Sequence, residues 1–395
     1  MKPIEIKKDV YALSAVDWNL RDFHGYETEN GSTYNAYLVK GTDKTVLFDT
    51  VKAEFAGEFI AALKSIIDPE KIDYIVSNHS EMDHTGALPK VLEVVKPAKL
   101  LTTKRGVDTL QGHFHLDDWP FEIINKDQPL DLGGKTVRFI ASPMLHWPES
   151  MVSFIPEDGV LISNDIFGQH WATSERFDDE VSRGELRRQA AKYFANIFYP
   201  VSAGMKRFVG KLKSGEMKLE MLAVDHGLIW RKYIPEILDL YEGWSTGQTE
   251  HKAVIVFDTM WGSTGMMARA VADGLIEKGV SVKLMDLHHN HRSDVITEIL
   301  ESRAVVVGSP ILNKEILPKM ADILTYMKGL DPAKGKIAGS FGSYGWSDTI
   351  TKMINERLDG MNFERVDDGL SINYVPDTAG LKACFDYGVK IAGAM

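Results

Sequence analysis

The 395-residue sequence predicts a protein of two α/β domains. From residue 249 onward, five almost wholly apolar strands alternate with amphipathic helices, a pattern typical of a doubly wound parallel sheet covered on both faces. Before residue 248, short strands with polar turns dominate, and side chains that bind metals well follow several of them. A helical pattern breaks at residues 243–250, so we expect domains at 1–248 and 249–395.

The first domain is predicted to open with a meander of short strands at residues 10–13, 33–39 and 45–48. A helix over 55–67 and a strand over 72–76 follow. The next predicted helix, 87–95, accepts Pro89 only in its first turn, because proline lacks the N–H that the helix interior needs.

One hexapeptide after the strand at 72–76 concentrates four potential metal ligands: His79, Glu81, Asp83 and His84. It begins where the apolar run stops, which is where loops carry chemistry on a rigid scaffold. The alternative, a solvated acidic turn, does not explain two histidines among the acids. The hexapeptide is therefore predicted to bind metal.

Three later strands repeat this arrangement. The strand at 136–140 precedes His146, the strand at 160–163 precedes Asp165, and the strand at 219–224 precedes His226. Taken singly, each is more often an ordinary turn residue. Together with the hexapeptide they supply four imidazoles and three carboxylates, enough for two metals, and ligand type alone leaves zinc and iron open.

The second domain carries a predicted phosphate site where its first strand meets a helix. The connecting loop lacks the lysine of an ATP-binding Walker loop and does not spell GxGxxG. Two further loops, after the third and fourth strands, add small residues and aromatic faces. The candidate binding residues are Thr259, Met260, Trp261, Gly262, Ser263 and Thr264; Pro310, Ile311, Leu312 and Asn313; and Ser340, Phe341, Gly342, Ser343, Tyr344, Gly345 and Trp346.

These two sets of motifs resemble those of the flavodiiron proteins. The order HxExDH…H…D…H is similar to their metallo-β-lactamase-like αββα domain, and the three loops resemble the FMN site of flavodoxin. The resemblance implies FMN and two non-haem irons. It places His79, Glu81 and His146 on one iron, Asp83, His84 and His226 on the other, and Asp165 between them, with His24 and Tyr193 close by.

The resemblance also implies a function: reduction of O₂ to water, of NO to N₂O, or of both, at a di-iron centre supplied by FMN. The electron donor would be a separate rubredoxin, reduced deazaflavin or flavoreductase, and the assembly a head-to-tail homodimer or a dimer of dimers. Two alternatives remain at this stage. One is a metallo-hydrolase with an appended flavodoxin-like domain, and the other is an electron carrier whose first domain only docks partners.

Composition restricts the remaining possibilities. A formal net charge of -11 argues against a nucleic-acid partner, which needs a basic face. No apolar run approaches the roughly 20 residues of a membrane span, and the start has no signal-peptide core, so we expect a cytoplasmic protein and no membrane partner. Cys384 is the single cysteine, which excludes a disulfide or a rubredoxin centre within this sequence.

Overall fold

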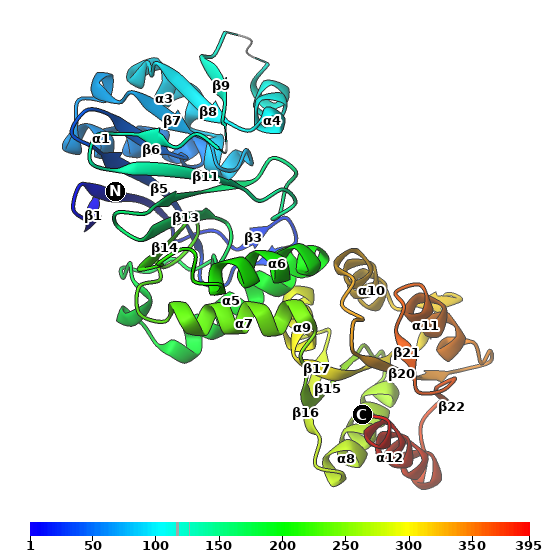
Figure 1. Cartoon of the computed structure of the whole chain (residues 1–395). Coiled ribbons are helices and arrows are strands. Elements are labelled where there is room, and N and C mark those ends of the chain that lie inside the picture. The colour runs from blue at the N-terminus through cyan, green and yellow to red at the C-terminus, as the bar shows by residue number, and fades with distance from the viewer. Residues whose placement is uncertain (116–117, 126) are drawn as a thin grey trace. The chain divides into compact units, whose positions relative to one another are not determined.

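The computed structural model describes residues 1–115, 118–125 and 127–395 (Figure 1). These residues form two compact units. The first unit comprises Met1–His24, Thr28–Tyr193 and Ala203–Glu242, and the second comprises Gly25–Glu27, Phe194–Ser202 and Gly243–Met395.

Two sheets form the centre of the first unit. The seven-stranded sheet has the order β1 (Ile4–Lys7), β2 (Val10–Asp17), β5 (Ser32–Lys40), β6 (Thr45–Phe48), β7 (Tyr74–Val76), β8 (Lys99–Thr102) and β9 (Phe121–Ile123). The five-stranded sheet has the order β10 (Leu130–Asp131), β11 (Thr136–Ala141), β12 (Met151–Ile155), β13 (Val160–Asn164) and β14 (Met221–Val224). The first sheet is antiparallel as far as β6 and parallel from β6 to β9. In the second sheet, β13 and β14 run parallel.

The inner faces of the two sheets share one apolar core. Val46 and Val76 of the first sheet belong to the same buried cluster as Phe139 and Ile162 of the second. The outer face of the first sheet packs on the helices α1 (Ala56–Ile66), α3 (Leu88–Val95) and α4 (Lys104–Phe114). Figure 1 shows α5 (Arg183–Tyr193), α6 (Ser202–Lys213) and α7 (Ile234–Thr246) beside the second sheet, which gives an αββα arrangement.

The second unit contains a six-stranded sheet in which every pairing is parallel. Its order is β16 (Ser281–Asp286), β15 (Glu250–Phe257), β17 (Ser302–Gly308), β20 (Ile337–Tyr344) and β21 (Glu364–Arg365), with β22 (Leu370–Asn373) also on β20. The helices between these strands are α8 (Ser263–Glu277), α9 (Arg292–Leu300), α10 (Pro318–Leu330) and α11 (Ile350–Asp359), and α12 (Thr378–Gly393) follows the last strand. The predicted doubly wound sheet is therefore confirmed, and the chain order reverses between β15 and β17, where such sheets bind ligands.

Two predicted element ends were wrong. The helix α7 continues to Thr246, through the first half of the predicted linker at 243–250, because Trp244 is buried and its Nε1–H donates to Glu301 at 2.8 Å. The strand β20 continues to Tyr344, so the predicted loop at 340–346 is mostly strand. None of the helices in the described part of the chain combines the length and the apolar character that a membrane span requires.

Candidate metal centre and cofactor cavity

Four strand ends of the first unit deliver the seven predicted metal ligands to one place. His79 and Glu81 follow β7, and the short helix α2 (Met82–Thr85) contains Asp83 and His84. The remaining ligands follow three strands of the second sheet: His146 after β11, Asp165 after β13 and His226 after β14. Because carboxyl ends of parallel strands meet at one edge of a sheet, ligands far apart in sequence lie side by side.

Three of the ligands surround one carboxylate oxygen of Asp165. Oδ2 of Asp165 lies 3.3 Å from Nε2 of His79 and 3.1 Å from Nε2 of His146. Oε2 of Glu81 lies 3.2 Å from the first nitrogen and 3.4 Å from the second. We call His79, Glu81 and His146 the His79 group.

The other three ligands surround the second oxygen of Asp165. Oδ1 lies 3.1 Å from Nε2 of His84 and 3.2 Å from Nε2 of His226. The Asp83 carboxylate lies 3.4 Å from the same atom of His84 and 3.1 Å from that of His226. We call Asp83, His84 and His226 the His226 group; Asp165 lies between the two groups and contacts both.

The donor set fits two metal ions. Both carboxylate oxygens of Asp83, both ring nitrogens of His84 and Oδ1 of Asp165 are buried and form no hydrogen bond with any described residue. Buried polar atoms without hydrogen bonds are rare in native proteins, and an ion is one standard explanation. Imidazole nitrogens with carboxylates are a donor set suited to non-haem iron and to zinc.

The electrostatics of the cluster favour positive charge at its centre. Burial raises the pKa of Asp165, but the charge of His84 and the close contacts with His146 and His226 outweigh it and hold that pKa well below its usual value. Burial lowers the pKa of His79, yet its contacts with Glu149 and Glu81 raise it well above the usual value. A cluster that retains protons on imidazoles stabilises cations, as a metal centre must.

Contacts on the far side of the imidazoles were not predicted from the sequence. The Nδ1 atom of His79 lies 2.8 Å from Oε1 of Glu149, and Nδ1 of His226 lies 2.7 Å from the carbonyl oxygen of Thr33. The Nδ1 atom of His84 lies 3.5 Å from Oδ2 of Asp225. Such outer partners fix the orientation and tautomer of metal-binding histidines.

The two residues predicted beside the metals lie at opposite extremes of exposure. The His24 side chain is 78% exposed, with Nε2 4.0 Å from Oε1 of Glu81. Tyr193 is buried at the end of α5, and its ring centroid lies 6.0 Å from that of His226. Burial and the charge of Asp165 raise the pKa of Tyr193 well above the usual value, so its hydroxyl stays protonated. A further histidine near these ligands, His170, was missed; its ring lies 4.8 Å from that of His226, and its Nδ1 lies 2.7 Å from Ser32 Oγ.

A cavity of about 1130 Å³ lies at the carboxyl ends of the strands in the second unit. It is lined by most of the predicted binding residues: Thr259, Met260, Trp261, Ser263, Pro310, Ile311, Leu312, Asn313, Ser343, Tyr344, Gly345 and Trp346. Ser263 begins α8, so the partial positive charge of a 15-residue helix faces the cavity where a phosphate would bind. The aromatic rings are suited to cover a flat ring system. The cavity therefore fits FMN.

Five of the predicted binding residues do not line this cavity. Gly262 has φ +89° and begins the turn into α8, where its N–H donates to Thr259 Oγ1 at 3.1 Å. Thr264 is buried, with its hydroxyl 3.0 Å from that of Ser343. The other three, Ser340, Phe341 and Gly342, lie inside β20 because the strand is longer than predicted.

Several residues of the cavity wall were not predicted. They come from the turn after β18 (Ile311–Leu312), from α11 and its N-terminal approach, and from the residue after β22: Lys314, Ser347, Thr349, Lys352, Met353, Glu356 and Tyr374. The sequence gives no signal for them, because only the folded sheet brings α11 to the loops that the motif identifies.

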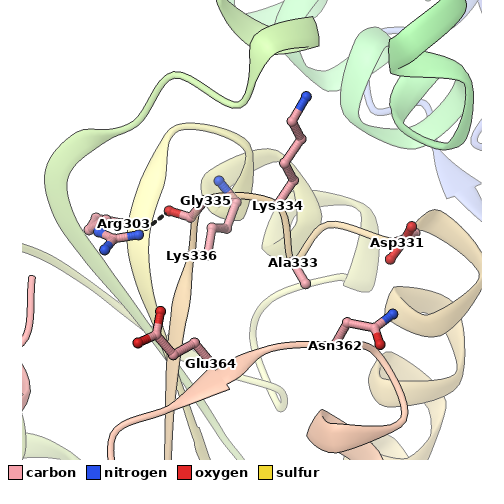
Figure 2. Close-up of a pocket in the computed structure, with 8 residues that line it drawn as sticks. All are labelled: Arg303, Asp331, Ala333, Lys334, Gly335, Lys336, Asn362 and Glu364. Carbon is pink, nitrogen blue, oxygen red and sulfur yellow. Dashed lines mark hydrogen bonds between the residues drawn. The ribbon is translucent and has the colours of Figure 1, made fainter.

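A second cavity of the same unit, of about 350 Å³, lies at the opposite ends of β17 and β20 (Figure 2). Two of the cationic side chains that line it, Arg303 and Lys336, donate to backbone carbonyls. The Lys336 ammonium donates to the carbonyls of Leu300 and Ser302 at 3.1 and 3.0 Å, and Figure 2 shows the guanidinium of Arg303 against the carbonyl of Gly335. Burial and the charge of Arg303 lower the pKa of Lys336 to about 7. The Lys336 ammonium thus caps the carboxyl end of α9, and the larger cavity is the better fit for a flavin.

Comparison with known proteins agrees with the folds of both units. Models of two families match the chain, the "ODP family beta lactamase" over residues 33–227 and flavodoxin over residues 255–388. A nitric oxide reductase of Moorella thermoacetica is 44% identical, over 99% of this chain and 98% of its own. A rubredoxin-oxygen oxidoreductase of Megalodesulfovibrio gigas is 42% identical, over 100% of this chain and 98% of its own.

Solved structures give the same result over the full length. The rubredoxin oxygen:oxidoreductase from Desulfovibrio gigas matches with a TM-score of 0.96 and 42% identity, over 100% of this chain and 98% of its own. The flavodiiron protein from Giardia intestinalis matches with a TM-score of 0.96 and 32% identity, over 100% of this chain and 96% of its own. The predictions of fold, of an oxidoreductase and of flavin and di-iron cofactors are thereby confirmed, and the chain belongs to the flavodiiron protein family.

Proposed function

We propose that this chain reduces O₂ to water, NO to N₂O, or both, with FMN as the immediate electron source for a di-iron centre. One observation carries the proposal: seven ligand side chains from four strand ends converge in two groups that share Asp165. Two relatives named for these reductions, one for NO and one for O₂, match nearly the whole chain and support it.

The proposed ligands of one iron are His79, Glu81 and His146, and those of the other are Asp83, His84 and His226, with Asp165 between them. When bound, two irons supply two adjacent Lewis-acidic, one-electron redox centres. The three carboxylates balance much of the metal charge within a buried site. All four imidazoles present Nε2 to the centre. In His79 and His226, Nδ1 faces an outer acceptor, which holds the ring in this orientation.

Two nearby residues have proposed roles in the reaction. Tyr193 stays protonated and buried beside Asp165, so its hydroxyl is a suitable hydrogen-bond donor to the substrate gas. His24 is exposed near Glu81, and an exposed imidazole is suited to exchange protons with water. Both roles are proposals that rest on position.

In the second unit, we propose that FMN fills the large cavity. Ser263 and the start of α8 would hold the phosphate, and Trp261, Tyr344 and Trp346 would cover the ring system. The Pro310–Asn313 segment would approach the ring edge. The Ile311 and Leu312 side chains at this edge are apolar, so backbone groups would supply the hydrogen bonds there.

The test is cofactor analysis followed by kinetics. Purified protein should be yellow, with about two irons per FMN, and should consume O₂ or NO when a chemically reduced carrier is supplied. The alternative, a metallo-hydrolase with an appended flavodoxin-like domain, predicts zinc and no flavin-dependent gas consumption. Zinc in place of iron after anaerobic expression in iron-rich medium, with no turnover of either gas, would refute the reductase.

The electron donor is proposed to be a separate carrier. Candidates are a rubredoxin, reduced deazaflavin and a flavoreductase; the M. gigas relative is named for rubredoxin. The single cysteine of this chain is buried and cannot form a Cys₄ iron site. We also propose that the protein acts in the cytoplasm, in keeping with its lack of any disulfide. Rates of FMN reduction by each carrier at equal concentration would rank the donors.

We propose further that the active assembly is a head-to-tail homodimer, or a dimer of such dimers, in which the flavin of one copy faces the irons of its partner. Support comes from the rim of the flavin cavity, where Trp261 and Trp346 are 94% and 95% exposed. Two large aromatic rings in water at a redox cavity are typical of a surface that a protein partner covers.

Complementation in a mixed dimer tests the assembly. A His79→Asn chain keeps its flavin and a Ser263→Asp chain keeps its irons. In a purified mixed dimer, transfer between copies predicts that one of two working sites is recovered. Transfer within a copy predicts none, since each chain lacks one cofactor, so an inactive mixed dimer would contradict the head-to-tail arrangement.

A further inference from the structure

The two metal positions differ in what stands behind their imidazoles. The His79 ring is held between the cluster and a buried carboxylate: Nε2 faces Glu81 and Asp165, and Nδ1 lies 2.8 Å from Oε1 of Glu149. The His226 ring instead has a neutral acceptor, the backbone carbonyl of Thr33. The carboxylate behind His84 lies 3.5 Å away, and neither ring nitrogen of His84 forms a hydrogen bond with a described residue.

The hydrogen bond between His79 and Glu149 fixes which nitrogen can bind metal. An ionised carboxylate only accepts hydrogen bonds, so Nδ1 of His79 must carry the proton and donate it. The lone pair is then on Nε2, which points at Glu81 and Asp165. A carboxylate acceptor also draws the Nδ1 proton toward itself and makes Nε2 a stronger donor to a cation.

Glu149 is itself held firmly in place. Its Oε1 also accepts the backbone N–H of Ser80 at 3.0 Å, and its carbonyl oxygen accepts the Thr103 hydroxyl at 3.1 Å. Its side chain is as deeply buried as that of His79. Glu149 also belongs to the β11–β12 connection that carries His146, so one loop supplies a ligand directly and supports another ligand from a different sheet.

We propose that Glu149 is a positioning residue that makes the two metal positions unequal: by accepting the Nδ1 proton of His79, it strengthens metal binding in the His79 group and leaves the His226 group unaffected. The inference rests on the proposed metal centre. It predicts that the first metal equivalent added to the metal-free protein enters the His79 group.

The experiment isolates each group before changing Glu149. Asp83→Asn weakens the His226 group, and His146→Asn weakens the His79 group. Glu149→Gln and Glu149→Ala are then made in each background, and Co(II) affinity is measured by competition with a chelator on metal-free, FMN-containing protein. Glutamine can still accept the Nδ1 proton but carries no charge. Circular dichroism of each metal-free variant serves as the check on folding, and the flavin unit contains none of the three changed residues.

The expected result is selective. In the Asp83→Asn background, Glu149→Gln should lower the Co(II) affinity about 10-fold and Glu149→Ala about 100-fold, the range typical of lost outer partners of metal-bound histidines. In the His146→Asn background, either change should alter affinity less than about 2-fold. Equal losses in both backgrounds, or no loss in the first, would overturn the proposal.

A second measurement reports on the hydrogen bond directly. In the zinc-loaded protein with ¹⁵N-labelled histidine, the Nδ1–H of His79 should give a slowly exchanging proton signal at low field that shifts upfield in Glu149→Gln and broadens or disappears in Glu149→Ala. A structural defect alone would not select this one signal among the ligand histidines. Asp225→Asn, which removes the more distant carboxylate behind His84, is the matched control and should leave it unchanged. If wild-type protein takes up no metal, the metal centre itself is refuted. If it takes up two metals and the Glu149 variants bind them as the wild type does, only this inference is refuted.

Discussion

Replacement of Asp165 by asparagine should disable both metal positions together. The side chain keeps its shape and one oxygen but loses the charge that both groups contact. Its oxygens lie 3.1 to 3.3 Å from four imidazole nitrogens. At that separation and an effective dielectric constant near 20, one pair of unit charges interacts by about 5 kcal/mol.

A loss of about 5 kcal/mol lowers the affinity for a cation by between three and four orders of magnitude. Glu81→Gln removes a carboxylate that contacts only the His79 group, so it should weaken one position and spare the other. Iron content after dialysis against a weak chelator, with circular dichroism as the folding control, measures both variants. An Asp165→Asn protein that still holds two irons within tenfold of wild-type affinity would refute the shared position of Asp165.

Two further predictions concern the second unit. Ser263→Asp puts a carboxylate at the start of α8 in the expected phosphate site, so repulsion between like charges should lower FMN affinity by several orders of magnitude while iron is retained. Ser263→Ala is the control for the lost hydroxyl. Stoichiometric FMN in the purified Ser263→Asp variant would contradict this placement of the phosphate. The second prediction concerns Lys336, whose folded pKa of about 7 is below the unfolded value of about 10.5. Between these pH values the unfolded chain binds more protons than the folded chain, so stability should increase as pH rises from 7 to 10. The free energy of unfolding increases by at most about 5 kcal/mol. Hydrogen bonds from the charged ammonium to the two carbonyls stabilise the charged form and make this increase smaller. This increase should be absent in Lys336→Met. Hydrogen exchange of the β20 amides, measured as a function of pH in the wild-type protein and in Lys336→Met, checks it. The same pH dependence in both proteins would contradict the lowered pKa of Lys336.

The strand-end positions of the ligands could be predicted from the sequence because each ligand lies within a few residues after a short apolar run. His146, Asp165 and His226 needed no knowledge of tertiary structure beyond the rule that strand ends carry function. The contact with Glu149 could not be predicted, since 70 residues separate it from His79 and no local pattern joins them. The two-group geometry around Asp165 likewise came from the family resemblance, not from residue spacing.

The wrong boundaries in the second unit have tertiary causes. Gly243 suggests a break, but burial of Trp244 and its bond to Glu301 extend α7 beyond it. Within β20, Gly342 suggests a loop, yet its α-carbon packs against the carbonyl of Ser309, where a Cβ would come within 2.2 Å of the oxygen. Glycine is there for close approach of backbones, a role that sequence alone does not separate from turn formation.

The ligand loops are held by contacts that do not involve metal. Asp49 accepts hydrogen bonds from both the backbone and the side-chain amide of Asn78, each at 2.7 Å, directly before His79. The N–H of Thr50 donates to the carbonyl of His84 at 2.8 Å, and the N–H of Met151 donates to the carbonyl of Asn78 at 3.0 Å. Because sheet ends and buried amides fix these backbones, cation binding need not supply the free energy that orders the loops. We therefore expect metal affinity in the proposed centre to depend mainly on charge and on the imidazole donors, which are the quantities that Asp165→Asn and Glu149→Gln would change.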